Sequence, residues 1–216
     1  IHIGYGKTGS SALQSFFAKH KDQLKENNII YPDHQSFLLA KKGWVSSGNG
    51  SMLIDKTFEI DSKKSCHYLF SSEHLGGVLK SEENFIELIT RFGNDIAIIC
   101  YCRDLFEHYI STWGQYIKRG GGTKNINEYS SIYGGFYKDV LNCLQLAEKF
   151  KIKFYVRNYS RHKSSLVNSF LEVLNLDVSE FDVSSDERQV VNRSLTISEY
   201  TLQTLFNKYF ERSEER

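Results

Sequence analysis

The sequence predicts an α/β protein with three α/β/α layers around a central, mainly parallel sheet. Two observations predict this fold. Short apolar segments alternate with segments of helical periodicity along the chain. One of the apolar segments, Ile96–Cys102, shows no polar alternation, which is typical of a parallel strand covered on both faces. We expect a single domain over residues 1–216, with an irregular insertion at about 33–64.

The N-terminal elements follow one another closely. A strand at the N-terminus runs into a glycine-rich loop, and a helix follows, because apolar residues recur at helical spacing from Leu13 to Leu24. This helix is expected to end at Asn27, and residues 29–32 form a short extended piece. Residues 33–64 show no sustained period and are rich in glycine and serine, so we expect them to form loops near a ligand cleft.

The middle of the chain alternates between the two element types. Residues 67–71 are predicted to form a strand, and helical spacing over 85–92 predicts a helix that ends at Gly93. The apolar strand 96–102 then runs directly into Arg103. Polar residues that follow strands in such a sheet are the usual place for a binding site.

The C-terminal half continues the alternation. Helical spacing predicts helices over 105–117, 140–147 and 166–174, and residues 152–156 form a strand. The last helix opens at Thr196 with a capping-box pattern.

Composition limits the classes of function. The 27 Lys and Arg residues balance 26 Asp and Glu residues, so the net charge of +1 gives no support for a nucleic-acid partner. No apolar run approaches the ~20 residues of a membrane span, and we expect a soluble globular protein. The four cysteines fit no metal-site spacing, which favours a cytoplasmic location; an anchor upstream of Ile1 would instead allow a Golgi-lumen location.

The loop after the first strand has the composition of an anion site. Its glycines let the backbone approach a ligand closely, and the following helix directs free N–H groups to the same place. Lysine and hydroxyl side chains add donors. The residues expected to bind are Gly6, Lys7, Thr8, Gly9, Ser10 and Ser11.

This loop differs from the nucleotide-binding P-loop pattern G-x-x-x-x-G-K-[ST]. Counting from Gly4, the second glycine falls correctly at Gly9, but Ser10 stands where lysine is required and the lysine comes earlier, at Lys7. The central strand ends in Arg103 rather than in an acidic residue suited to Mg²⁺. A ligand with two anionic groups and no required metal is therefore expected.

Over most of its length the chain resembles the sulfotransferases that use 3′-phosphoadenosine 5′-phosphosulfate (PAPS), especially bacterial-type and glycan sulfotransferases, which have a P-loop-like fold. Residues 4–14 resemble the family's 5′-phosphosulfate loop, with Ser10 and Ser11 in place of two threonines. Arg103 and Ser111 resemble its 3′-phosphate pair, although Leu105 replaces the proline that usually follows the arginine.

The resemblance implies transfer of a sulfuryl group from PAPS to a hydroxyl or amine, with 3′,5′-ADP as the product. It implies that Lys7 stabilises the leaving phosphate and that Asn192 and Arg193 are weaker candidates for cofactor contacts. The family's glycan members often use a glutamate as the general base, which corresponds to Glu73 here, and His74 is the second candidate. A carbohydrate acceptor is favoured.

Two other functions stay open. One is a kinase or nucleoside triphosphatase with an aberrant loop, which predicts Mg²⁺-dependent ATP binding. The other is a non-catalytic nucleotide-binding module, which would retain Lys7 and Arg103 but would need no base.

Overall fold

A computed structural model describes residues 1–60, 65–134, 137–183 and 195–210. The chain divides into two compact units, Ile1–Cys102 with Phe136–Val191, and Arg103–Gly135 with Asn192–Arg216. That the two together form one domain stays a prediction.

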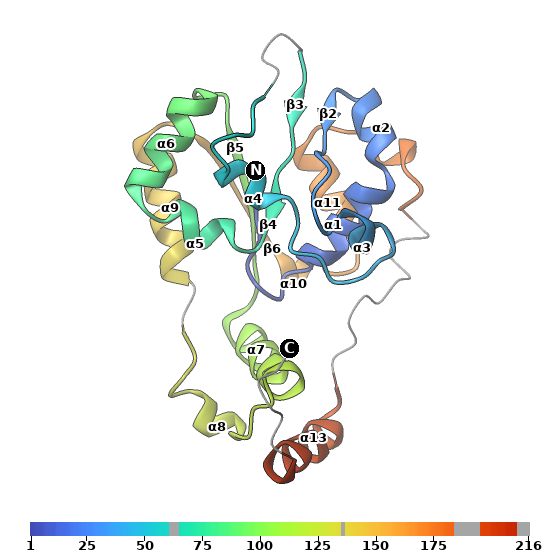
Figure 1. Ribbon diagram of the computed structural model, residues 1–216, viewed down its shortest axis with the longest axis vertical. Helices are drawn as coiled ribbons and strands as arrows, with labels where there is room; N and C mark the ends of the chain where they lie inside the picture. The colour runs from blue at the N-terminus through green and yellow to red at the C-terminus, as the bar shows by residue number, and fades with distance from the viewer. Residues whose placement is uncertain (61–64, 135–136, 184–194, 211–216) are drawn as a thin grey trace. The chain divides into compact units, whose positions relative to one another are not determined.

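A four-stranded sheet forms the centre of the first unit (Figure 1). Its strand order is β4-β1-β5-β6, and the neighbouring strands all run parallel, which confirms the predicted α/β class and the parallel sheet. In the register, His2 lies beside Ser71 and Ile99, and Ile99 lies beside Tyr155. The strands are β1 (His2–Ile3), β4 (Ser71–Ser72), β5 (Ala97–Cys102) and β6 (Lys153–Asn158).

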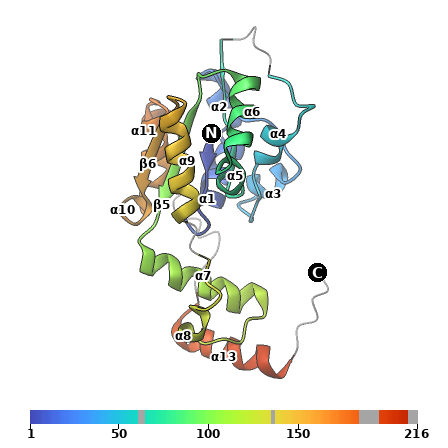
Figure 2. The same ribbon diagram turned by 90° about the vertical axis from the view of Figure 1, so that its left-hand side faces the viewer.

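Helices cover both faces of this sheet, as Figure 1 shows and as Figure 2 shows from the side of α9. Alternate residues of β5 point to opposite faces: Ile99 joins one buried apolar cluster and Ile98 joins the other. This arrangement is compatible with three α/β/α layers. The first cluster includes residues of α1 (Ser10–Lys19) and α11 (Leu166–Val173), and the second includes residues of α5 (Leu75–Leu79), α6 (Glu82–Phe92) and α9 (Tyr137–Lys149).

Several short elements of the first unit differ from the sequence-based expectations. The first predicted helix is divided at His20 into α1 and α2 (Lys21–Glu26). The predicted strand 67–71 is divided as well, because β3 (His67–Tyr68) pairs with β2 (Ile29–Ile30) in a separate two-stranded sheet, while Ser71 begins β4. Within the described part of the region 33–64, at residues 33–60, there are two short helices. The remaining elements are α3 (Phe37–Lys41), α4 (Gly50–Ile54), α10 (Tyr159–His162) and a 3₁₀ turn at Val178–Glu180.

The second unit contains α7 (Leu105–Gly120), α8 (Ile126–Tyr129) and α13 (Ile197–Tyr209). The Trp113 and Tyr200 rings pack 5.1 Å apart between α7 and α13. At the end of α7, the Nδ2 of Asn207 donates to the carbonyls of Ile117 (2.9 Å) and Gly122 (2.8 Å).

The predicted capping box of the last helix is confirmed. The Thr196 hydroxyl accepts from the Glu199 amide at 3.3 Å, and the Glu199 carboxylate accepts from the Thr196 amide at 2.7 Å.

Among the described residues, no helix is both long enough and apolar enough to cross a membrane.

Candidate functional site

The loop between β1 and α1 has an unusual backbone. Two of its residues lie in the left-handed region, with φ of 68° at Lys7 and 80° at Gly9. Glycine adopts this conformation freely, but lysine does so at a cost of about 1–3 kcal/mol, and such strain is found most often at ligand sites. The Gly9 carbonyl accepts from the amides of Ala12 (2.9 Å) and Leu13 (3.1 Å), so α1 begins directly after the loop.

The two ends of the loop are tightly packed, and its middle is open. A methyl group on Gly4 would lie 3.0 Å from the Cα of Glu73, and one on Gly9 would lie 3.0 Å from the ring of Tyr159. A methyl group on Gly6 would meet no described atom within 4 Å. The structure therefore brings the loop, Glu73 and Tyr159 together, and Gly6 is where the backbone is accessible to a ligand.

Ser10 begins α1 and points back towards the loop. Its side chain is in contact range of Gly4, and the residue is only 5% exposed. Among the described residues its Oγ has no hydrogen-bond partner, and α1 has no side-chain cap. An unpaired buried hydroxyl costs about 1–3 kcal/mol, so a polar group is expected here. The positive end of the α1 dipole, with half-buried Ser11 as its second residue, favours an anion.

Thr8 holds the loop in shape. It is fully buried, its Oγ1 donates to the Tyr5 carbonyl at 2.6 Å, and its amide donates to the same carbonyl at 3.3 Å. The hydroxyl proton is thus used within the loop. That Thr8 also contacts a ligand stays a prediction.

Glu73 and His74 follow β4 directly, and both are exposed. The amide of His74 donates to the Ser72 hydroxyl at 3.2 Å, which fixes the turn into α5. Among the described residues, neither the Glu73 carboxylate nor the His74 ring has a hydrogen-bond or ion-pair partner, so both side chains are available to accept a proton from a bound molecule.

A buried polar cluster surrounds Ser71, the first residue of β4. The His2 Nδ1 is 2.8 Å from the Ser71 hydroxyl, and burial lowers the pKa of His2 to about 3, so its ring is neutral. The side-chain Oδ1 of Asn49 accepts from the Ser71 amide at 2.7 Å, and the backbone amide of Asn49 donates to the Ser71 carbonyl at 3.1 Å. The Gln14 Nε2 donates to the Ser71 carbonyl at 3.4 Å. This cluster links β4, which Glu73 follows, to β1 and to the middle of α1.

The predicted 3′-phosphate pair lies in the second unit. Arg103 directly follows β5 and bonds through Nε to the Glu107 carboxylate at 3.1 Å, while Asp104 caps α7 by accepting from two amides at 3.0 Å. Ser111 is half-buried on α7 and shares a face with Glu107, one turn away. A phosphate at Arg103 would therefore compete with the Glu107 carboxylate. That Lys7 and Arg103 bind the same ligand stays a prediction.

Two predicted cofactor residues, Asn192 and Arg193, lie outside the described residues. Within the described part of the chain, no group of three or more His, Cys, Asp or Glu side chains is arranged to hold a metal ion.

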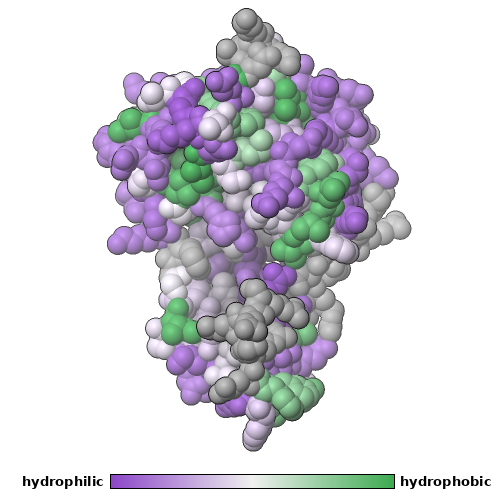
Figure 3. Space-filling view, viewed as in Figure 1, coloured by the Kyte–Doolittle hydropathy of each residue, from purple (hydrophilic) through white to green (hydrophobic). Residues whose placement is uncertain are grey.

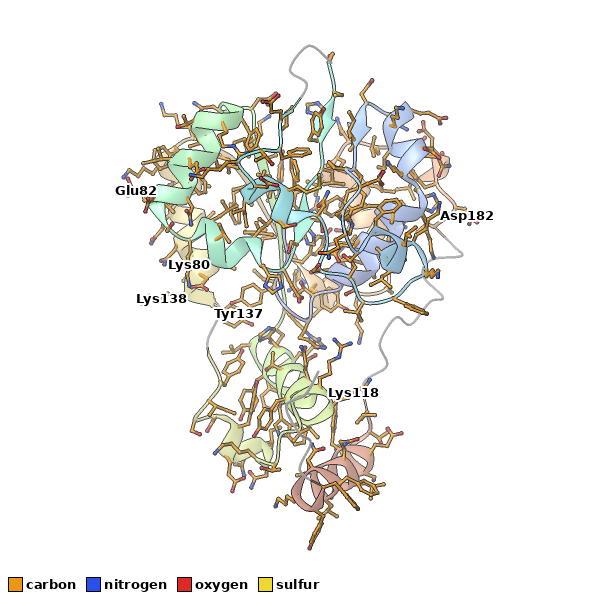
Figure 4. All side chains as sticks on the ribbon, viewed as in Figure 1. Lys80, Glu82, Lys118, Tyr137, Lys138 and Asp182 are labelled. Atoms are coloured by element: carbon orange, nitrogen blue, oxygen red, sulfur yellow. The ribbon has the colours of Figure 1, made fainter. Side chains whose placement is uncertain are left out.

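From the sequence, residues 154–159 resemble the strand-plus-tyrosine segment of the sulfotransferases only weakly, so Tyr159 was a weak candidate for the site, and no role was expected for Tyr137. Tyr159 packs at Gly9, and the rings of Tyr5 and Tyr137 lie 5.2 Å apart. Figure 4 labels Tyr137 at the start of α9, near Lys80, whose ammonium pairs with Asp139 at 3.1 Å and joins the end of α5 to α9. The polar side chain of Gln14, which follows Leu13 on the buried side of α1, is a sequence signal that could have indicated the polar cluster.

Comparisons of the chain with protein-family models, curated proteins and solved structures find no match.

Proposed function

We propose that this protein is a PAPS-dependent sulfotransferase with a P-loop-like fold, which transfers a sulfuryl group to a hydroxyl or amine of an acceptor. The observation that carries the proposal is the buried hydroxyl of Ser10 at the start of α1, which finds no hydrogen-bond partner in the described part of the chain, next to a loop in which Lys7 has a strained backbone. An anion bound here would give the hydroxyl a hydrogen-bond partner, and its binding energy would offset the cost of the strained backbone at Lys7.

The loop would hold the 5′-phosphosulfate group. Amides at Gly6 and at the start of α1, together with the Ser10 and Ser11 hydroxyls, would donate to its oxygens. In PAPS the sulfuryl group is bonded to an oxygen of the 5′-phosphate, so transfer to the acceptor breaks this S–O bond and releases 3′,5′-ADP. Lys7 would stabilise the negative charge that develops on the leaving oxygen, and this is the main catalytic contribution expected of a side chain in such a transfer.

Glu73 would act as the general base. Its backbone is in contact range of Gly4, so its carboxylate emerges beside the loop, where an acceptor hydroxyl in line with the leaving group would be placed. The Glu73 carboxylate has no hydrogen-bond or ion-pair partner among the described residues. An acceptor hydroxyl would therefore not have to displace one. His74, the next residue, is the second candidate, and a direct comparison of variants distinguishes the two.

The remaining roles follow from the chemistry of single residues. Arg103, with a guanidinium suited to bidentate phosphate binding, and Ser111 would recognise the 3′-phosphate, with Asn192 and Arg193 as further cofactor contacts. The proposed acceptor is a carbohydrate, and no metal is required.

Nucleotide binding tests the proposal most directly. In calorimetry we expect the protein to bind 3′,5′-ADP without Mg²⁺ and more tightly than Mg-ADP. Lys7→Ala should weaken this binding by at least tenfold, and Lys25→Ala, at an exposed lysine of α2, is the matched control. A preference for Mg-ADP would indicate a kinase or nucleoside triphosphatase and would refute the proposal.

Turnover tests the catalytic assignment. Mass spectrometry of products from PAPS with glycan, phenol and lipid acceptors should detect a mass increase of one sulfuryl group. Glu73→Gln should abolish this transfer without weakening 3′,5′-ADP binding. If Glu73→Gln transfers at the wild-type rate while His74→Ala does not, the base is His74. Tight 3′,5′-ADP binding with no transfer to any acceptor would favour a non-catalytic module.

A further inference from the structure

Large apolar side chains are exposed together on and just after α3. Leu38 is 71% exposed and Trp44 60%, while Leu39 and Val45 are each 41% exposed. Figure 3 shows apolar side chains gathered on the face of the first unit over α3 and the segment that follows it. We call residues 38–45 the α3 projection. Contiguous exposed apolar surface of this kind usually marks an interaction site.

The shape of the α3 projection is set by its backbone. Gly43 has φ of 75°, and the amides of Gly43 and Trp44 donate to the carbonyls of Ala40 and Leu39, each at 2.9 Å. These two bonds form a Schellman motif, which turns the chain back after the helix and places Trp44 beside Leu39. Ala40 is fully buried in the core that α1 helps to form. The exposed apolar side chains are therefore held on a fixed support and do not collapse onto the core.

The charged residues within the α3 projection are both basic. Lys41 and Lys42 are exposed within the projection, and the Lys42 ammonium lies 5.6 Å from the centre of the Trp44 ring. From His34 to Ile54 the sequence contains no Asp or Glu. The nearest preceding acid, Asp33, is paired with Lys21 at 2.7 Å. A partner surface with negative charge would be complementary.

We propose that the α3 projection docks on the surface of an anionic lipid membrane. Leu38 and Trp44, with Leu39 and Val45, would enter the boundary between headgroups and acyl chains, and Lys41 and Lys42 would contact the headgroups. Tryptophan is enriched at this boundary, and basic residues next to an apolar surface are attracted to anionic lipids. The occupant is assigned as a lipid surface because the projection combines an apolar surface with exclusively basic charge.

Vesicle co-sedimentation of the full chain tests this docking. We expect binding to vesicles of phosphatidylglycerol and phosphatidylcholine, but not to vesicles of phosphatidylcholine alone, and the binding should weaken as salt is raised. Leu38→Asp should reduce the affinity by at least tenfold. Lys41→Ser and Lys42→Ser should each reduce it by about fivefold. The matched control is Leu141→Asp, at a side chain on α9 that is 56% exposed, and it should bind as the wild type does.

Tryptophan fluorescence locates the contact. The chain has two tryptophans, and Trp113→Phe leaves Trp44 as the only one. Its emission should shift to the blue when anionic vesicles are added. The proposal is wrong if the wild type does not bind these vesicles, if Leu38→Asp and Leu141→Asp bind equally, or if Trp44 emission does not change on binding. A change of self-association by Leu38→Asp without any vesicle binding would show that the surface is occupied by a second copy of the chain.

Discussion

Replacing Ser10 with alanine is expected to stabilise the protein when no ligand is bound and to weaken its binding of 3′,5′-ADP. The Ser10 residue is 5% exposed, and its hydroxyl has no hydrogen-bond partner among the described residues. An unpaired hydroxyl in such a place costs about 1–3 kcal/mol, and its removal leaves only a small space. We therefore expect the free energy of unfolding to rise by about 1–2 kcal/mol, and the Tm by about 2–8 °C.

The matched control is Ser169→Ala. Ser169 is 2% exposed, as deeply buried as Ser10, but its hydroxyl lies 3.0 Å from the Tyr101 hydroxyl, which donates to it. Removing it leaves the Tyr101 hydroxyl without this partner and should lower the free energy of unfolding by about 1–3 kcal/mol. Each variant loses one buried serine hydroxyl. Opposite changes in the free energy of unfolding would therefore show the effect of the hydrogen-bond partner alone.

Urea unfolding without ligand measures both variants, and calorimetry with 3′,5′-ADP measures the binding of Ser10→Ala. Loss of a hydrogen bond to a charged phosphate should weaken the binding by about tenfold or more. If Ser10→Ala destabilises the free protein as much as Ser169→Ala does, the Ser10 hydroxyl is already satisfied. The main support for an anion site at α1 would then be lost.

Three further predictions concern His2, Gly9 and Asn207. The pKa of His2 is lowered by burial from 6.5 to about 3, so the unfolded chain binds a proton that the folded protein excludes, and stability is lost as the pH falls through this range. Between pH 6.5 and 5, the free energy of unfolding of the wild type should therefore fall by about 2 kcal/mol more than that of His2→Gln, as measured by urea unfolding at each pH. The same pH dependence in both proteins would show that the ring is protonated when folded. Gly9→Ala forces a side chain into φ of 80° beside Tyr159 and should lower stability by at least about 2 kcal/mol, whereas a Tm equal to that of the wild type would mean that the loop has another conformation. Asn207→Ala removes the bonds to two carbonyls at the end of α7 and should speed hydrogen exchange in α13, and equal exchange rates would argue against this packing.

The two six-residue strands, β5 and β6, and the longer helices were predictable because each has a regular pattern of its own. The apolar run ending at Cys102 indicated a covered parallel strand, and β5 has neighbours on both sides. The loop with Lys7 was recognised from its glycines and from the helix that follows it. The strained backbone of Lys7 and the Ser10 hydroxyl, which has no partner among the described residues, were not predictable, because a sequence pattern gives neither the φ of a single residue nor the hydrogen-bond partner of a single hydroxyl.

The region 33–64 shows where periodicity fails. Helices α3 and α4 have five residues each, little more than one turn, so no repeat of apolar residues can appear in the sequence. The break at His20 was hidden for the opposite reason, because apolar residues continue at helical spacing across it. The division into two units was also unseen, since α7 is as amphipathic as the helices of the first unit.

Asn49 has a consequence for aggregation. Strand β4 lies at one edge of the four-stranded sheet, and edge strands can pair with strands of other molecules. Asn49 accepts from the Ser71 amide, donates to the Ser71 carbonyl and donates to the Leu69 carbonyl at 3.0 Å, so one residue takes the hydrogen bonds that a further strand would use. Extension of the sheet is thus left to β6 at the opposite edge, where Lys153 is exposed, and a lysine on an edge strand disfavours pairing with the strands of other molecules.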